Sequence, residues 1–173
     1  MRKTVIIILT LLPLVPFCQK SILDKGFKNT AENQEVAVVV VNTSTNTIFQ
    51  TLTQSISDVF KEQKGYNTNP SFFNTNFIKD GSFEKLYNAD QYKIKKLNLA
   101  KHLDFLCLGK YSLLSSGQTN DGVNRADIQL QINFIDVKSG ATIDSRSYTE
   151  RGIGISTVEA ERNAIDRILK QLK

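Results

Sequence analysis

Three residues with reactive side chains lie close together in the middle of the chain. His102 precedes Asp104 by two positions, which suggests a general base and the acid that orients it. Positions i and i+2 at a helix end do not face each other, and no nucleophile stands at a recognisable spacing. Cys107 lies within the apolar run 105–108, where burial keeps a thiol protonated and inert. We therefore interpret His102 as a surface or cap residue and Cys107 as a core residue.

Glycines and acidic residues further along the chain suggest two other kinds of site. Gly152 and Gly154 precede a predicted helix, whose free backbone amides would attract phosphate. A dinucleotide loop needs a third glycine and a βαβ unit, so we interpret the pair as a tight strand-to-helix transition. A hydrolase needs two converging carboxylates with separated pKa values, and the spacing of the candidates brings no two together. Those candidates are Asp136, Asp144 and Glu150.

The start of the chain has the pattern of an export signal. Arg2 and Lys3 form a positive n-region, and residues 4–17 carry no charge. This apolar segment is shorter than the about 20 residues that cross a bilayer. Residues 1–18 are therefore predicted to be a signal peptide and not an anchor helix, and the protein is expected to be exported.

Cys18 ends this segment, where bacterial lipoproteins place the cysteine that is acylated and becomes the mature N-terminus. We therefore predict lipidation of Cys18. Phe17 is an atypical residue before such a cleavage point, so ordinary cleavage after Cys18, which exposes Gln19, stays open as the alternative. The two alternatives differ in membrane tethering and not in compartment.

The exported part is predicted to be one domain behind a tether. Residues 19–35 are polar and without sustained periodicity, which is typical of a flexible tether, and residues 36–173 have the size of a single domain. Export removes two of the 22 basic residues and none of the 17 acidic ones, so the formal net charge falls by two from +5. This mild charge does not favour nucleic acid. A single histidine excludes a histidine-rich metal cluster, and we expect no cofactor and no metal.

The first half of the domain is predicted to alternate strands and helices. Residues 36–41 form a continuous, mostly β-branched run, typical of a strand buried on both faces. Thr47 with a glutamine three residues later predicts a capping box for an amphipathic helix that ends before Gly65. Residues 66–78 carry several large apolar side chains and are predicted as a second strand. Residues 82–103 are predicted as a second helical region.

The second half is predicted to be a three-strand meander closed by a helix. Residues 105–114 form another buried strand, and residues 127–134 alternate apolar with polar side chains. A turn leads into a third strand over residues 141–151. Ser156 and a glutamate three residues later form a capping box for the last helix. The predicted fold class is α/β, a mixed β-sheet flanked by helices in the order βαβαβββα, as a single compact domain.

With this order in view, the chain resembles the exported lipoprotein superfamily that includes the curli secretion component CsgG and the penicillin-binding-protein activator LpoB. The resemblance lies in the leading strand 36–41, in residues 99–109, in the hairpin turn 135–140, and in Gly152-Ile153-Gly154 before the last helix. It implies a non-catalytic lipoprotein of the periplasm, anchored to the outer membrane, that assembles or regulates envelope machinery. No room remains for two long amphipathic hairpins, so a secretion pore is not expected.

We therefore predict a protein-binding module, not an enzyme, anchored to the outer membrane by lipid on Cys18. Its partner would be an envelope protein, and assembly into a homo-oligomer is left open. The alternative is an envelope hydrolase or a periplasmic protein that binds a small ligand. The partner surface is predicted on the polar face of hairpin 127–151 and on loop 115–124, or otherwise on the first helix around Gln54, Asp58 and Lys61. The predicted contact residues are Gln129, Gln131, Asn133, Arg146 and Tyr148.

Overall fold

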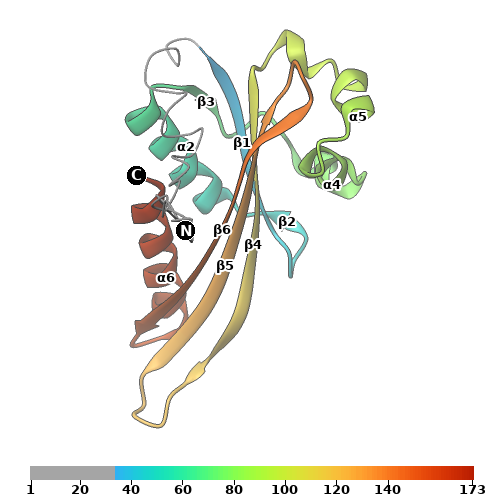
Figure 1. Ribbon diagram of the computed structural model, residues 1–173. Helices are drawn as coiled ribbons and strands as arrows, with labels where there is room; N and C mark the ends of the chain where they lie inside the picture. Colours follow the sequence, from blue (N-terminus) through green and yellow to red (C-terminus); the bar gives the residue numbers. More distant parts are fainter. Residues whose placement is uncertain (1–33) are drawn as a thin grey trace, which may run out of the picture.

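The computed structural model describes residues 34–173, which form a six-stranded sheet with helices on both faces (Figure 1). The strand order is β2-β1-β4-β5-β6, and β3 pairs with β1. The predicted α/β class with a mixed sheet is confirmed. The predicted signal peptide, Cys18 and residues 19–33 of the predicted tether lie outside the described residues. Within residues 34–173, no helix is both long and apolar enough to cross a membrane.

The centre of the sheet is formed by the two strands that the sequence marks as buried. β1 (Glu35–Asn42) runs parallel to β4 (Phe105–Gln118), and side chains 36–41 of β1 are all buried. Alternate residues of β1 enter two separate cores: Val36, Val38 and Val40 on a first face, and Ala37, Val39 and Val41 on a second face. A continuous apolar run suits this position because helices cover both of its faces.

Two long helices, α2 (Gln50–Lys64) and α6 (Thr157–Leu172), cover the first face. The predicted capping box at Thr47 is wrong. Thr47 pairs with Asn42 in the short strand β2 (Thr47–Ile48), so the helix begins three residues later, after Phe49, and has no side-chain cap. The predicted end is confirmed, since Gly65 adopts the left-handed conformation with φ of 74°.

Short helical segments cover the upper part of the second face (Figure 1). They are α3 (Thr75–Lys79), α4 (Ser82–Tyr87), α5 (Gln91–Lys96) and the 3₁₀ helix η1 (Leu99–Lys101). The strand predicted over 66–78 is largely wrong, because only β3 (Asn67–Asn69) is extended. Asn74 caps α3 instead, and Phe73 stacks on Phe77 at 3.9 Å between ring centroids. Aromatic residues at this spacing pack as one cluster on the sheet rather than alternating across a strand.

The meander strands are longer than predicted. β5 (Asn124–Asp136) and β6 (Ala141–Gly154) continue antiparallel pairing along β4, which has an irregularity between Leu113 and Ser115. Half of the loop predicted over 115–124 is therefore strand, because β4 continues to Gln118, which still pairs with Asn124. In Figure 1 the lower ends of these strands extend well beyond α4 and α5. The lower half of the second face is consequently left without helices.

Candidate protein-binding surface

The uncovered part of the second face carries polar side chains in two cross-strand rows. In one row Lys110 of β4 pairs with Gln131 of β5, which pairs with Ser147 of β6. In the next row the paired residues are Ser112, Gln129 and Thr149. We call these six residues the open face. Three adjacent strands thus present ammonium, amide and hydroxyl groups from positions fixed by the sheet.

Only part of the hydrogen-bonding capacity of the open face is used within the domain. Gln129 Nε2 donates to Ser147 Oγ at 3.4 Å, and the hydroxyls of Ser112 and Thr43 lie 2.8 Å apart. Within residues 34–173 the side chains of Gln131 and Thr149 make no hydrogen bond to protein, and both are exposed. They are therefore available to a partner or to water.

Helix α4 forms the upper border of the open face. Lys110 Nζ lies 2.7 Å from Glu84 Oε2 and 4.3 Å from the centre of the Tyr87 ring. Asn133 Nδ2 donates to the Tyr87 carbonyl at 2.9 Å, while its Oδ1 accepts from Ser145 Oγ at 2.7 Å. Asn133 is therefore held by the fold on both sides of its amide, and it borders the open face rather than presenting free polar atoms.

A charged network forms the lower border. Asp127 accepts from Arg151 Nε at 2.6 Å and from Ser115 Oγ at 2.7 Å, and Arg125 Nε lies 3.9 Å away. The hydrogen bonds from Arg151 and Ser115 lower the pKa of the Asp127 carboxyl below its ordinary value of 3.8. Two arginines and a serine thus hold this carboxylate at the lower border.

Arg146 and Tyr148 are not on the open face, so the prediction that the five contact residues share one face is wrong. Arg146 pairs with Ile132 and Tyr148 pairs with Leu130, whose side chains belong to the first-face core. Tyr148 packs against that core, and Arg146 Nε lies 3.0 Å from Asp144 Oδ2. β6 lies at the sheet edge beside α6, and its half-buried face is lined by the stems of polar residues. Only Gln129 and Gln131 of the predicted set belong to the open face.

The residues considered for nucleophilic or base chemistry are separated by the fold. Cys107 is buried, and burial raises the pKa of its thiol to about 12, which suits the predicted core role. His102 is exposed at the C-cap of η1. The Asp104 carboxylate accepts from Lys138 Nζ at 2.9 Å and from the Glu35 amide at 3.1 Å instead of orienting His102.

The three acidic residues considered for hydrolysis each have a separate structural partner. Asp136 accepts from the Ser139 amide at 2.7 Å, Asp144 pairs with Arg146, and Glu150 accepts from the side-chain amide of Gln171. No two of them form a converging pair. Within residues 34–173, no group of three or more histidine, cysteine or acidic residues is placed to hold a metal ion.

The two glycines before α6 serve packing. A Cβ atom at Gly152 would lie 1.8 Å from the Ala160 carbonyl oxygen, and one at Gly154 would lie 2.7 Å from the Ala160 amide nitrogen. The Ser156 hydroxyl accepts from the Glu159 amide at 3.2 Å, so the predicted cap is present. The Glu159 carboxylate in turn accepts from the Ile155 amide. The side chains of Ser156 and Glu159 thus already accept hydrogen bonds from backbone amides that a phosphate would need as donors.

Sequence reasoning missed four of the six open-face residues: Lys110, Ser112, Ser147 and Thr149. Ser147 and Thr149 stand in a stretch of β6 where polar residues occupy both alternating sets, so no periodicity marks the exposed set. The register across the turn pairs Ser147 with Gln131 and Thr149 with Gln129. Because apolar and polar residues alternate regularly around Gln129 and Gln131, this register would have identified Ser147 and Thr149 as exposed.

Comparison with known proteins identifies the fold. No protein-family model matches the chain, and no curated protein matches its sequence significantly. The structure is similar to lipoprotein GNA1162 from Neisseria meningitidis, with a TM-score of 0.53 and 12% identity over 82% of this chain and 97% of that one. The predicted resemblance to exported lipoproteins is thus confirmed at the level of the fold.

Two other solved structures align over much of the chain with lower scores. The PelC L103M dodecamer from Paraburkholderia phytofirmans has a TM-score of 0.46 and 14% identity, over 80% of this chain and 86% of that one. The LpoB C-terminal domain from Salmonella enterica has a TM-score of 0.41 and 12% identity, over 74% and 91% of the two chains.

Proposed function

We propose that this protein is a non-catalytic lipoprotein of the bacterial envelope that binds a protein partner through the open face. The observation that carries the proposal is the pair of polar rows across β4, β5 and β6, on which helix α4 contacts only Lys110 among the described residues. Side chains on paired strands are held in fixed relative positions, which favours recognition over chemistry. The shared fold with lipoprotein GNA1162 supports the envelope assignment.

The composition of the open face fits a specific but polar interface. Gln131, Ser147 and Thr149 are exposed and offer both donors and acceptors, while Lys110 is held by Glu84. Protein interfaces carry about one hydrogen bond per 100–200 Å², which such a surface can supply. The partner is therefore expected to present complementary amide, hydroxyl or backbone groups rather than a large apolar patch.

The proposal includes the compartment. Acylation of Cys18 would hold the domain at the outer membrane, on its periplasmic side, through residues 19–33. A multiply acylated terminus gives stable anchoring, whereas a single chain binds only marginally. The lipid places the domain beside its partner, and the open face supplies the specificity.

Partner capture from crosslinked envelopes tests the proposal. We expect Gln131→Arg combined with Thr149→Arg to abolish capture, because two long charged side chains would then project from the open face. The matched control is Gln63→Arg combined with Thr51→Arg, at exposed positions of α2. Surface changes usually stay within about ±0.5 kcal/mol, so both variants should keep the melting temperature within a few degrees.

The control also separates this proposal from an interface on the first helix. Capture that survives the open-face change but is lost with the α2 change would place the partner on α2, around Gln54, Asp58 and Lys61. If capture survives both changes, the partner binds neither the open face nor α2, and the proposal is contradicted.

A further inference from the structure

A group of uncompensated lysines lies at the upper end of the domain. Lys95, Lys96 and Lys101 are exposed on α5 and η1, and within residues 34–173 none of the three makes an ion pair. Residues 91–103 contain no acidic side chain. This end of the domain therefore carries a concentrated positive charge although the whole protein is only mildly basic.

An exposed aromatic residue stands among these lysines. Tyr92 is 74% exposed, and Lys95 and Lys96 follow it at i+3 and i+4, the positions that neighbour it on a helix surface. A large exposed aromatic side chain flanked by lysines is typical of the membrane–water interface. There the ring lies at the headgroup level and the lysine stems extend beside it.

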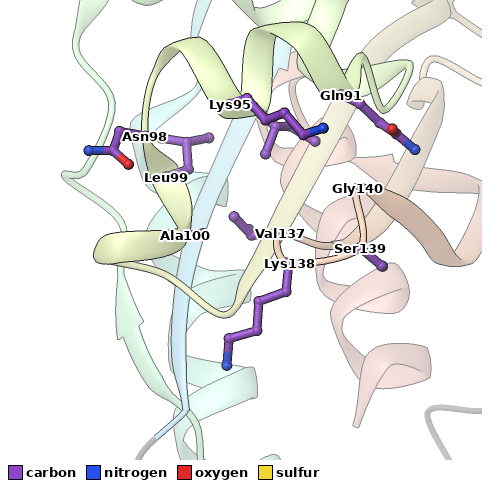
Figure 2. Close-up of a pocket in the computed structure, with 10 residues that line it drawn as sticks. Gln91, Lys95, Asn98, Leu99, Ala100, Val137, Lys138, Ser139 and Gly140 are labelled. Atoms are coloured by element: carbon purple, nitrogen blue, oxygen red, sulfur yellow. The ribbon is translucent and has the colours of Figure 1, made fainter.

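A fourth lysine connects this group to the start of the domain. Lys138 lies on the turn between β5 and β6, across a pocket of about 250 Å³ from Lys95 (Figure 2). Its Nζ donates to Asp104, whose carboxylate also accepts from the Glu35 amide at 3.1 Å. Glu35, near the start of the described residues, therefore lies close to Lys138. We call Tyr92, Lys95, Lys96, Lys101 and Lys138 the lysine end.

We propose that the lysine end rests on the surface of an anionic phospholipid bilayer. The inference goes beyond partner binding and relies on the proposed function only for the tether at Cys18, since a tether that enters beside the lysines would present this end to the membrane. The tips of β4 and β5 lie at the opposite end of the sheet (Figure 1). The strands that carry the open face would then point away from the membrane into the periplasm. The row with Gln129 would lie farther from the membrane than the row with Gln131.

Vesicle binding tests the proposal without the acyl anchor and without the partner. The protein carrying Cys18→Ser, purified from the soluble periplasm after export, is mixed with vesicles of equal parts phosphatidylcholine and phosphatidylglycerol, or of phosphatidylcholine alone, and the bound fraction is measured by sedimentation. We expect binding to the anionic vesicles only, weakening as salt is added. No binding to the anionic vesicles, or equal binding to both, would overturn the proposal and leave partner capture untouched.

Two matched variants locate the contact. Lys95→Gln with Lys96→Gln should reduce the partition coefficient roughly 30-fold, since each lysine near an anionic surface is worth about 1 kcal/mol. Arg125→Gln with Arg162→Gln removes the same charge from the lower part of the molecule and should leave binding nearly unchanged. An equal loss in both variants would show attraction by net charge alone and would contradict a defined lysine end.

A fluorescent reporter tests the same contact independently of affinity. The chain contains no tryptophan, so Tyr92→Trp introduces a single one at the lysine end. Its emission should shift to the blue on anionic vesicles and be quenched by brominated lipid. Val158→Trp, at a position that is also 74% exposed but lies at the start of α6, should change little. The reverse pattern would overturn the proposed orientation.

Discussion

Gly152 lies so close to Ala160 that a methyl group on Gly152 would stand 1.8 Å from the Ala160 carbonyl oxygen. α6 therefore rests directly on the backbone of β6. We expect Gly152→Ala to lower the free energy of unfolding by about 3 kcal/mol or more, at the upper end of the usual cost of overpacking, because backbone cannot move aside as a side chain can. Urea unfolding followed by circular dichroism measures this change.

Gly117→Ala is the matched control, because a Cβ atom there meets nothing within 4 Å. Its free energy of unfolding should stay within about 0.5 kcal/mol of the unchanged protein. A similar shift in the two variants would contradict the direct contact between α6 and β6.

The buried strand β4 makes a second prediction. Leu106 and Leu108 are fully buried between β1 and β5, so Leu106→Ala or Leu108→Ala should lower the free energy of unfolding by about 2–5 kcal/mol. Leu114 lies on the same strand but is 54% exposed, and Leu114→Ala should cost less than about 1 kcal/mol. Small shifts at both buried positions would mean that β4 is not central.

Sequence patterns predicted well those elements whose burial is simple. β1 is apolar at every position because both of its faces are covered, and α6 has an apolar stripe with a capping serine at its start. In each case the local pattern and the tertiary environment favour the same structure. These elements were therefore predicted with nearly correct bounds.

Sequence patterns gave wrong predictions for the segments whose structure is determined by tertiary contacts. The aromatic residues of 66–78 suggested a strand, but Asn74 caps a helix and Phe73 and Phe77 stack on each other. β6 has an edge position and is half-buried beside α6 through Arg146, Tyr148 and Gly152 rather than through an apolar set. Its alternation therefore gave no sign of which residues face solvent, and Arg146 and Tyr148 were assigned to the wrong face.

The charged network at the lower border of the open face should make the stability of the protein depend on pH. Arg151 and Ser115 lower the pKa of the Asp127 carboxyl in the folded protein below its ordinary value of 3.8. The ionised carboxylate therefore stabilises the fold at pH values above 3.8, and this stabilisation is lost as the pH falls through the lower pKa of the folded protein. Asp127→Asn should therefore be less stable than the unchanged protein near neutral pH, and the difference should shrink below about pH 4. Urea titrations over this range measure it. A difference that does not depend on pH would contradict a role for the charge.

Lipidation of Cys18 makes a prediction about mass and location. Intact-mass spectrometry of protein extracted from membranes should show an acylated N-terminal cysteine, and Cys18→Ser should release the domain into the soluble periplasm. An unmodified N-terminus at Gln19 would instead support ordinary cleavage and contradict the lipid anchor.

Site-specific photo-crosslinking tests the open face most directly. A photoreactive amino acid at position 131, on the middle strand of the open face, should form a covalent product with one envelope protein in living cells. The same amino acid at position 162, on the exposed side of α6, should not give that product. A product from position 162 with none from position 131 would contradict the central claim that the open face binds the partner.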